Sequence, residues 1–421
     1  MKKGIWDRNR THDAPGTLKT GRKDLRSRNK WVLLHLIQTG GPKSQAELAR
    51  LSGLSPAAVS GILQPLIEAE ILVEERKTTT GLGRKASILG FNPRAVVSVG
   101  ISIDQEGSEV ALVDLSGRVI DHVSTAYPRY TDPREVVAQS AACVLDLMER
   151  RQADPRASVG VGVAIPGLVD STSGLVSVAS NLGWRNVELQ SLFEKELRLP
   201  VRVEHLGRAK ARAEGVWGAG ANCRNFVCLE IGSGIGAGVI VDGIVLHGAR
   251  ESAGEVGHMP VDPSGPRCAC GLNGCWEVFC AGNAIPRRLA DRLAATDSSD
   301  GSLGARATLA QIGKAALEGH PIATQVIDET AEYLARGLVG IIWSFDPEII
   351  ILSGPVVRDC PSLIQATRAR LQTVVAARNF DIPLVPARQE ADAGVIAASA
   401  IVSLPFVEEL SRAEANPQLM V

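Results

Sequence analysis

The sequence predicts an α/β protein whose body has two lobes, preceded by a small winged helix-turn-helix domain. A chain of 421 residues is long enough for two or three domains. From residue 93 onward, short apolar runs typical of buried strands alternate with amphipathic helical segments. Before residue 93, three short helical segments are followed by two strands that enclose a basic loop.

Charge is divided unevenly along the chain. Residues 1–92 hold 16 Lys and Arg against 8 Asp and Glu, a net charge of +8, whereas the whole chain carries −1. A basic head on an acidic body predicts that the head meets a polyanion. Residues 1–24 are polar and lack periodicity, so we expect a flexible basic arm. The arm either touches DNA phosphates or is a disordered tail, and the second interpretation is slightly favoured.

Nothing in the sequence indicates export or a membrane. The N-terminal segment has no apolar core of the kind that signal peptides carry, and no apolar run is long enough to span a bilayer. Eight cysteines without a secretory signal predict a reducing, cytoplasmic location.

Helix signals follow one another in residues 25–92. Apolar spacing predicts a first helix over residues 25–38. Ser44 can cap a second helix. Ser55 can cap a third, with Pro56 at its first position. Pro65 should kink that third helix or end it early.

This arrangement predicts a helix-turn-helix, in which the later helix enters the major groove. Strands expected at residues 71–75 and 87–91 enclose a basic wing suited to phosphate or minor-groove contact. The alternative interpretation is a small helical packing unit without a DNA partner. The predicted DNA-binding residues are Ser44, Gln45, Ser55, Pro56, Ala57, Ala58, Ser60, Arg84 and Lys85.

The stretch from Gly254 to Glu277 holds one imidazole and three thiols at close spacing: His258, Cys268, Cys270 and Cys275. Such a set makes a closed tetrahedral site for structural Zn²⁺, with no position left for a reactive water. A reduced cysteine-rich loop or a disulfide between two of the three cysteines are the alternatives. Glu255 and Glu277 flank the stretch and suit a polyhydroxylated ligand, unless they are solvated loop charges.

This stretch resembles the signature of the ROK family of repressors and sugar kinases. The matching segments are Ala253–Met259 and Cys268–Glu277, and weaker matches run from about residue 25 to residue 400. The resemblance implies an actin-like, sugar-kinase-like fold for residues 93–421, which would bind an effector and form oligomers. It identifies residues 25–92 as the winged helix that the family's repressors carry. It also implies that Asn181, Glu255, His258 and Glu277 bind ligand hydroxyls.

Two features of the family's kinases are absent from this sequence. The phosphate-binding turn after the first strand has lost its glycines, and Ser102, Asp104, Gln105 and Glu106 stand at its positions. Carboxylates there should repel ATP. The Asn-Asp pair that holds the catalytic base is replaced by His205 and Leu206, and leucine cannot accept a proton.

The resulting hypothesis is a transcriptional regulator without enzyme activity, most simply a repressor of carbohydrate-related genes. Its expected partners are a double-stranded DNA operator, a sugar or sugar-phosphate effector, and further copies of itself in a homodimer or homotetramer. Two alternatives stay open. One is a sugar kinase with a DNA-binding head, and the other is a constitutive DNA-binding protein whose cleft binds nothing.

Overall fold

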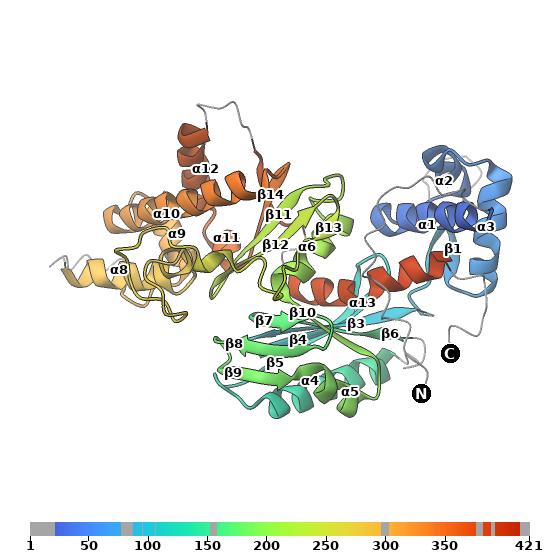
Figure 1. Cartoon of the computed structure of the whole chain (residues 1–421), viewed down its shortest axis with the longest axis horizontal. Coiled ribbons are helices and arrows are strands. Elements are labelled where there is room, and N and C mark those ends of the chain that lie inside the picture. Colours follow the sequence, from blue (N-terminus) through green and yellow to red (C-terminus); the bar gives the residue numbers. More distant parts are fainter. Residues whose placement is uncertain are drawn as a thin grey trace.

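The computed structural model describes residues 22–76, 87–94, 96–105, 107–151, 158–295, 303–375, 382–388 and 392–412. In this part of the chain, a head of helices and two strands lies beside a body of two lobes (Figure 1). Each lobe is built on its own five-stranded sheet. The predicted order of head and body is therefore observed.

The head consists of α1 (Arg22–Gly40), α2 (Gln45–Ser52), α3 (Pro56–Glu68) and the antiparallel strands β1 (Leu72–Arg76) and β2 (Ser87–Phe91). Ser44 caps α2 by accepting a hydrogen bond from the backbone of Glu47, whose side chain completes the capping box. Ser55 caps α3 in the same way. Both predicted caps are confirmed. α1 begins at Arg22, inside the segment that we expected to be a flexible arm, and residues 1–21 lie outside the described chain.

Of the two outcomes expected at Pro65, a kink in α3 or an early end, the early end does not occur. The helix continues to Glu68 with Pro65 inside it. Leu63 and Leu66, on either side of the proline, are almost fully buried in the core of the head. Burial of such side chains stabilises a helix by about 1.5–3 kcal/mol each, enough to offset the hydrogen bond that proline removes.

The first lobe is built on the sheet with strand order β10-β6-β3-β4-β5. A second, three-stranded sheet joins β7, β8 and β9. Helices α4 and α5 complete the lobe. The elements are β3 (Val97–Asp104), β4 (Gly107–Asp114), β5 (Val119–Ala126), α4 (Pro133–Arg151), β6 (Ser158–Ile165), β7 (Leu168–Asp170), β8 (Leu175–Ala179), β9 (Trp184–Glu188), α5 (Leu189–Leu197) and β10 (Val201–His205).

The second lobe repeats this plan with the order β13-β12-β11-β14-β15, and helices surround one end of its sheet (Figure 1). In each lobe two antiparallel pairs are followed by parallel strands. The elements are α6 (Leu206–Trp217), β11 (Phe226–Ile231), β12 (Ile235–Val241), β13 (Ile244–Val245), η2 (Val256–His258), α7 (Glu277–Cys280), α8 (Ala284–Ala295), α9 (Leu309–Leu317), α10 (Pro321–Phe345), β14 (Ile349–Ser353), α11 (Pro355–Asp359), α12 (Pro361–Val375) and β15 (Leu384–Pro386).

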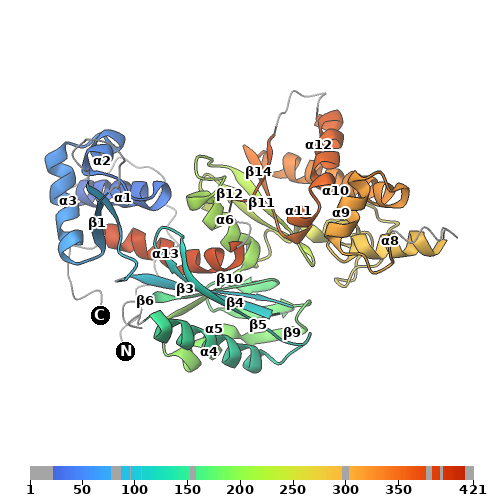
Figure 2. The ribbon, with the colours of Figure 1, turned by 180° about the vertical axis from the view of Figure 1, so that it is seen from behind.

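Helix α13 (Ala393–Arg412) runs across the first lobe from the region between the lobes to the head, as Figure 2 shows from behind. It packs on β3 and β6 through glycine. A Cβ atom at Gly162 would lie 1.8 Å from the carbonyl oxygen of Ala398, so only glycine permits this approach. α13 is long and apolar enough to cross a membrane, but half of that stretch is buried inside this protein. Its apolar character is thus explained by its place in the core.

The core of the head is shared with the body. Val407 of α13 and Leu115, which follows β4, belong to the same buried cluster as Leu34 and Leu63 of the head. The head therefore packs against the first lobe through apolar side chains, which ties its position to that lobe.

Candidate effector and metal site

One loop of the second lobe carries most of the predicted site residues. It leaves η2, returns into α7, and is closed by a backbone hydrogen bond of 2.8 Å from Cys268 to Leu272. Beside it, Trp276 is fully buried in the core of the lobe and anchors the return. The loop thereby brings His258 back to the start of α7.

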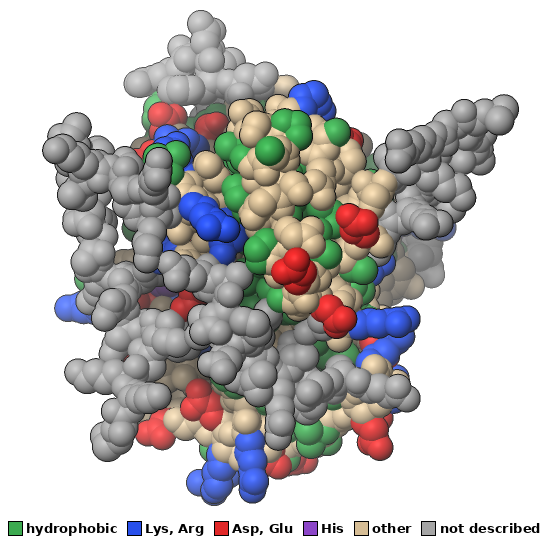
Figure 3. Space-filling model, turned by 90° about the vertical axis from the view of Figure 1, so that its right-hand side faces the viewer, with side chains coloured by type: hydrophobic (Ala, Val, Ile, Leu, Met, Phe, Trp, Pro, Cys, Tyr) green, Lys and Arg blue, Asp and Glu red, His purple; other side chains and the backbone are tan. Residues whose placement is uncertain are grey.

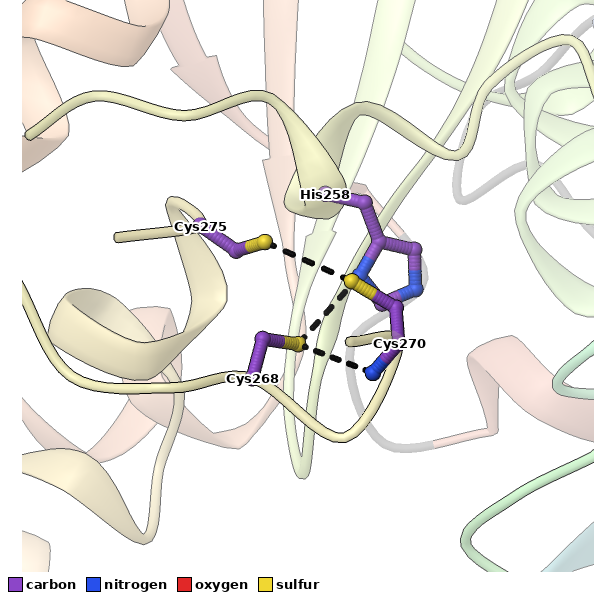
Figure 4. Close-up of side chains that lie close together, drawn as sticks. All are labelled: His258, Cys268, Cys270 and Cys275. Carbon is purple, nitrogen blue, oxygen red and sulfur yellow. Dashed lines mark hydrogen bonds between the residues drawn. The ribbon is translucent and has the colours of Figure 1, made fainter. Parts of the chain in front are cut away.

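The four predicted metal ligands lie together at this point (Figure 4). Their donor atoms, one from each of His258, Cys268, Cys270 and Cys275, are all within 4.8 Å of one another. Cys268 Sγ lies 3.6 Å from His258 Nδ1, and Cys270 Sγ lies 3.6 Å from Cys275 Sγ. Ligands of tetrahedral zinc, at bond lengths near 2.3 Å, stand about 3.8 Å apart. The donor set and its spacing fit such an ion.

The state of the thiols agrees with a metal site better than with a disulfide. All three cysteines are free, and the 3.6 Å between Cys270 and Cys275 is far beyond a sulfur–sulfur bond. Burial raises the pKa of Cys268 and of Cys275, because removal from water disfavours the thiolate. Binding of a cation would therefore release protons from these thiols.

Two carboxylates lie beside the metal ligands on the same loop. Glu277 Oε1 is 3.4 Å from His258 Nδ1 and accepts a hydrogen bond of 3.1 Å from Cys268 Sγ. Glu255 Oε2 is 3.9 Å from the other ring nitrogen of His258, Nε2. The single imidazole can therefore present Nδ1 to a metal and Nε2 toward Glu255. Burial raises the pKa of Glu255, against the opposing charges of His258 and Arg208.

Asn181, the remaining predicted ligand-binding residue, reaches this group from the first lobe. Its amide nitrogen donates to Ser233 Oγ at 3.2 Å, in the glycine-rich loop after β11. A Cβ atom at Gly234 would lie 3.0 Å from Glu277 Oε2 and 3.9 Å from Asn181 Nδ2. The structure thus gathers Asn181, Glu255, His258 and Glu277 around one place between the lobes.

A fifth side chain belongs to this group and was not among the predicted site residues. His205 ends β10, and its Nε2 lies 3.7 Å from Glu255 Oε1. Its Nδ1 is buried and has no hydrogen-bond partner among the described residues. Burial, reinforced by the charge of Arg208, lowers the pKa of His205 to about 3, so the ring is neutral. The sequence feature that could have identified His205 is its position at the carboxyl end of a parallel strand, where α/β proteins bind ligands.

A cavity of about 470 Å³ lies further along the space between the lobes. Leu206 lines it, as do Ser102 and Asp104 from the turn where kinases of the family cradle phosphate. Asp104 Oδ1 accepts a hydrogen bond of 2.6 Å from the backbone of Gln105. Glu106 lies outside the described residues. No proton-accepting side chain stands at position 206, as the sequence indicated.

The cavity also contains charges that the sequence analysis did not identify. Lys210 Nζ lies 2.7 Å from Glu230 Oε2 and donates to Ser353 Oγ at 3.2 Å. Its ammonium is thus engaged by the protein. Glu109 also lines the cavity, and burial together with the nearby Asp392 raises its pKa.

The predicted DNA-binding residues of α2 and α3 lie at the beginnings of these helices. Ser55, Pro56 and Ala57 are exposed, and Ser44, Gln45, Ala58 and Ser60 are partly exposed. The exposed side of α3 also carries Gln64, which we did not predict. Arg84 and Lys85 lie in residues 77–86, outside the described chain.

On the side of the molecule that Figure 3 faces, the described surface shows apolar and small groups with scattered charges. A continuous basic patch is not seen among the described side chains of that view. Eleven of the 16 basic residues of the segment 1–92 fall where the structure describes no side chain. Most of the predicted basic character of the head is therefore outside the described part.

Comparison with known proteins agrees with this architecture. Residues 98–404 match the ROK family, and residues 27–79 match the MarR family. The xylose repressor of Bacillus spizizenii is 28% identical over 385 residues, which cover 90% of this chain and 96% of that protein. The DNA-binding transcriptional dual regulator NagC of Escherichia coli K12 is 29% identical over 382 residues, covering 90% and 92%.

Solved structures share the fold. A ROK family transcriptional regulator described as a homologue of the E. coli MLC protein has a TM-score of 0.72 at 28% identity, covering 92% of this chain and 98% of its own. A ROK glucokinase from Streptomyces griseus, solved with glucose and AMPPNP, has a TM-score of 0.65 at 27% identity. It covers 73% of this chain and 99% of its own.

Proposed function

The chain belongs to the ROK family and carries a MarR-type winged helix, and from this we propose that it is a sugar-responsive transcriptional repressor. The observation that carries the proposal is the combination of two parts in one chain. A winged helix is packed onto a body that gathers the side chains predicted to bind hydroxyl groups, while leucine stands at the position of the kinase base.

The head would bind operator DNA with α3 in the major groove. Ser55, Pro56, Ala57, Ala58 and Ser60 lie at the beginning of α3 and are small enough for the backbone to approach base edges. Ser44 and Gln45, at the start of α2, would contact the backbone of the duplex. Arg84 and Lys85 would add phosphate contacts from the wing. A homodimer or homotetramer would supply the two heads that a symmetric operator needs.

The effector would be a sugar or sugar derivative held between the lobes by Asn181, Glu255, His258 and Glu277. The carboxylates of Glu255 and Glu277 each lie within 4 Å of the His258 imidazole, a spacing that suits several adjacent hydroxyl groups. Relatives whose names are xylose repressor and N-acetylglucosamine repressor support a carbohydrate ligand. A ligand that binds one lobe arrangement better than the other would shift the position of the heads.

His258, Cys268, Cys270 and Cys275 would hold one structural zinc ion. The ion would fix the loop that carries Glu255 and Glu277, and so would keep the effector groups in place. The ion itself would not contact the effector, which would be bound by the side chains alone.

Phosphoryl transfer is not part of this proposal. A kinase needs a base at the sugar hydroxyl and a phosphate cradle, and this chain has Leu206 and Asp104 at those two places. Two cations line the cavity, Lys210 and Arg358, and Lys210 is paired with Glu230.

The proposal is tested by selecting DNA from a random-sequence pool with the full-length protein. We expect a symmetric site whose binding weakens steeply with salt, and whose binding is lost when residues 1–92 are removed. If the truncated body binds the selected site as well as the full chain does, the head is not the DNA-binding element.

A further inference from the structure

A buried arginine joins the two lobes next to the effector site. Arg208, on α6, is only 1% exposed. Its Nε donates to Glu204 Oε1 at 2.7 Å, and its Nη2 donates to the carbonyl oxygen of Val169 at 3.0 Å. Glu204 is in β10 and Val169 in β7, so both partners belong to the first lobe.

The same guanidinium binds the second lobe through Glu251. Arg208 Nη1 donates to the Glu251 carbonyl oxygen at 2.8 Å, and Nη2 lies 3.4 Å from its carboxylate. That carboxylate also lies 2.9 Å from His247 Nδ1 and accepts a hydrogen bond of 3.2 Å from Ser171, which follows β7 in the first lobe. Ser171 therefore reaches this carboxylate across the interface, and Arg208 connects it with Glu204 and Val169 of the first lobe.

Glu251 is held in an unfavourable backbone conformation. Its φ is +56°, in the left-handed region that residues with a Cβ atom disfavour. Such a conformation persists only where the surroundings fix it. Here Arg208, Ser171 and His247 are those surroundings, so loss of the contacts would free the segment to relax.

The segment that begins at Glu251 leads directly into the effector site. Glu255 follows four residues later. Between them, a Cβ atom at Gly254 would lie 2.0 Å from the carbonyl oxygen of Ala237, so the chain is pressed against β12 and has little slack. On the other side, Glu204 precedes His205, whose ring faces Glu255. Arg208 thus contacts the stretch that carries Glu255 and the stretch that carries His205.

The core of the head includes residues of the first lobe and of α13, and α1 also contacts α6, whereas Glu251 and Glu255 belong to the second lobe. Apolar residues of the head share a core with Leu115 and Val407 of the first-lobe side. A change of angle between the lobes would therefore move the segment from Glu251 to Glu255, here called the effector loop, relative to the head.

We propose that Arg208 is a positioning residue whose contacts with Glu204, Val169 and Glu251, here called the clasp, hold the effector loop against the lobe that carries the head. We propose further that the clasp sets the affinity of the head for DNA. The inference rests on the proposed function as a regulator. While the clasp is intact, the two lobes keep one relative angle and the heads keep one position. When Glu251 is displaced, the clasp is broken and the lobes can adopt a second angle.

The test uses four full-length variants and no sugar. Arg208→Lys and Glu251→Gln each break the clasp from one side, and their double variant breaks it from both sides. Arg212→Lys is the matched control, because Arg212 lies one turn further along α6, outside the clasp. Hydrogen exchange is measured over residues 166–172 and 247–258, and affinity is measured for the DNA that the wild type selects. Circular dichroism checks that each variant is folded, and the isosteric Glu251→Gln remains decisive if Arg208→Lys does not fold.

We expect faster exchange in both stretches at once for either clasp variant. We also expect a change in DNA affinity of about 5-fold to 150-fold, the usual range for coupled sites. The double variant should add little to either single one, because all remove the same interaction. The control should match the wild type.

Two results would overturn the inference. One is faster exchange with unchanged DNA affinity, which would leave Arg208 a purely structural residue. The other is exchange that rises in only one of the two stretches, which would mean that no clasp joins them. A wild-type chain that binds no DNA would instead refute the proposed function, and the exchange measurement would still decide whether the clasp exists.

Discussion

Among single residues, His205 combines burial, a neutral ring and a position beside Glu255. It is 6% exposed, and burial followed by the charge of Arg208 lowers its pKa to about 3. A neutral imidazole can both donate and accept a hydrogen bond, which suits a sugar hydroxyl. The replacement of the kinase's asparagine by histidine therefore leaves a polar group at the site.

This environment predicts a pH dependence of stability. Above pH 6.5, His205 is neutral in the folded and unfolded states and makes no difference. Below pH 6.5 the imidazole takes up a proton in the unfolded chain but not in the folded chain. The free energy of unfolding therefore falls by about 1.4 kcal/mol for each unit by which the pH is lowered, until pH 3 is approached. Urea unfolding between pH 7 and pH 4.5 should show a shallower decline for His205→Gln than for the wild type. His122→Gln, on an exposed position of β5, should keep the wild-type slope, and equal slopes for all three proteins would refute the assignment.

The metal ligands give a second prediction for single residues. Purified protein should contain about one zinc ion per chain, and Cys268→Ser should lose the ion and melt at a lower temperature, because metal binding contributes to folding free energy. Elemental analysis and calorimetry measure the two effects. The control is Cys223→Ser, at a partly buried cysteine outside the metal cluster, and this variant should keep the ion. A metal-free wild type prepared without chelators would contradict the site.

Among the elements, α3 has the two faces that a DNA-reading helix needs. Val59, Ile62, Leu63 and Leu66 are buried in the head, while Ala57, Gly61 and Gln64 are exposed. These exposed positions follow the spacing of one helix face. The buried face fixes the helix, and the exposed face is free for a groove.

Different substitutions in the head should therefore have different effects. Gln64→Ala should relax preference at one base pair, since an amide that pairs with adenine contributes about 1–3 kcal/mol of discrimination. Arg84→Ala should instead weaken binding to all sequences and reduce the salt slope by about one. Competition binding with single-base variants of the selected site separates the two. If Gln64→Ala weakens every site equally, the side chain contacts the backbone rather than a base.

For the whole molecule, the position of α13 connects the space between the lobes with the head. Its first residues, Ala393 and Gly394, line the cavity, and Val407 lies in the core of the head. The head is thus held by a helix that starts where the lobes meet. A ligand that binds where the lobes meet would therefore act on the head through a single helix.

A ligand screen tests this control on the full chain. D-xylose, N-acetylglucosamine or glucose should raise the melting temperature, by an amount that corresponds to about 2.7 kcal/mol at 100 times the dissociation constant. Glu255→Gln should abolish the shift, and ATP with Mg²⁺ should give neither a shift nor sugar-dependent turnover. Turnover by the wild type would restore the alternative of a kinase with a DNA-binding head. Absence of a shift with every sugar would favour the alternative of a constitutive DNA-binding protein.

Features that depend on local spacing could be predicted from the sequence. Ser44 and Ser55 cap their helices because a cap acts within one turn, and His258 and the three cysteines were expected to cluster because they share one short loop. The absence of a base at Leu206 also followed from one position in a motif. Whether α3 ends at Pro65 or continues past it was left open, because the helix signal at proline is local and the stabilising burial is not.

Only the tertiary structure decided which distant residues meet. It placed His205 against Glu255, joined Arg208 to Glu251 across the lobes and paired Lys210 with Glu230 in the cavity. It also showed that the core of the head includes Val407, near the other end of the chain. Periodicity and motif spacing report how a side chain faces its own element. The partner that a buried charge or apolar group finds depends on how the elements pack, because that packing alone brings remote residues within contact distance.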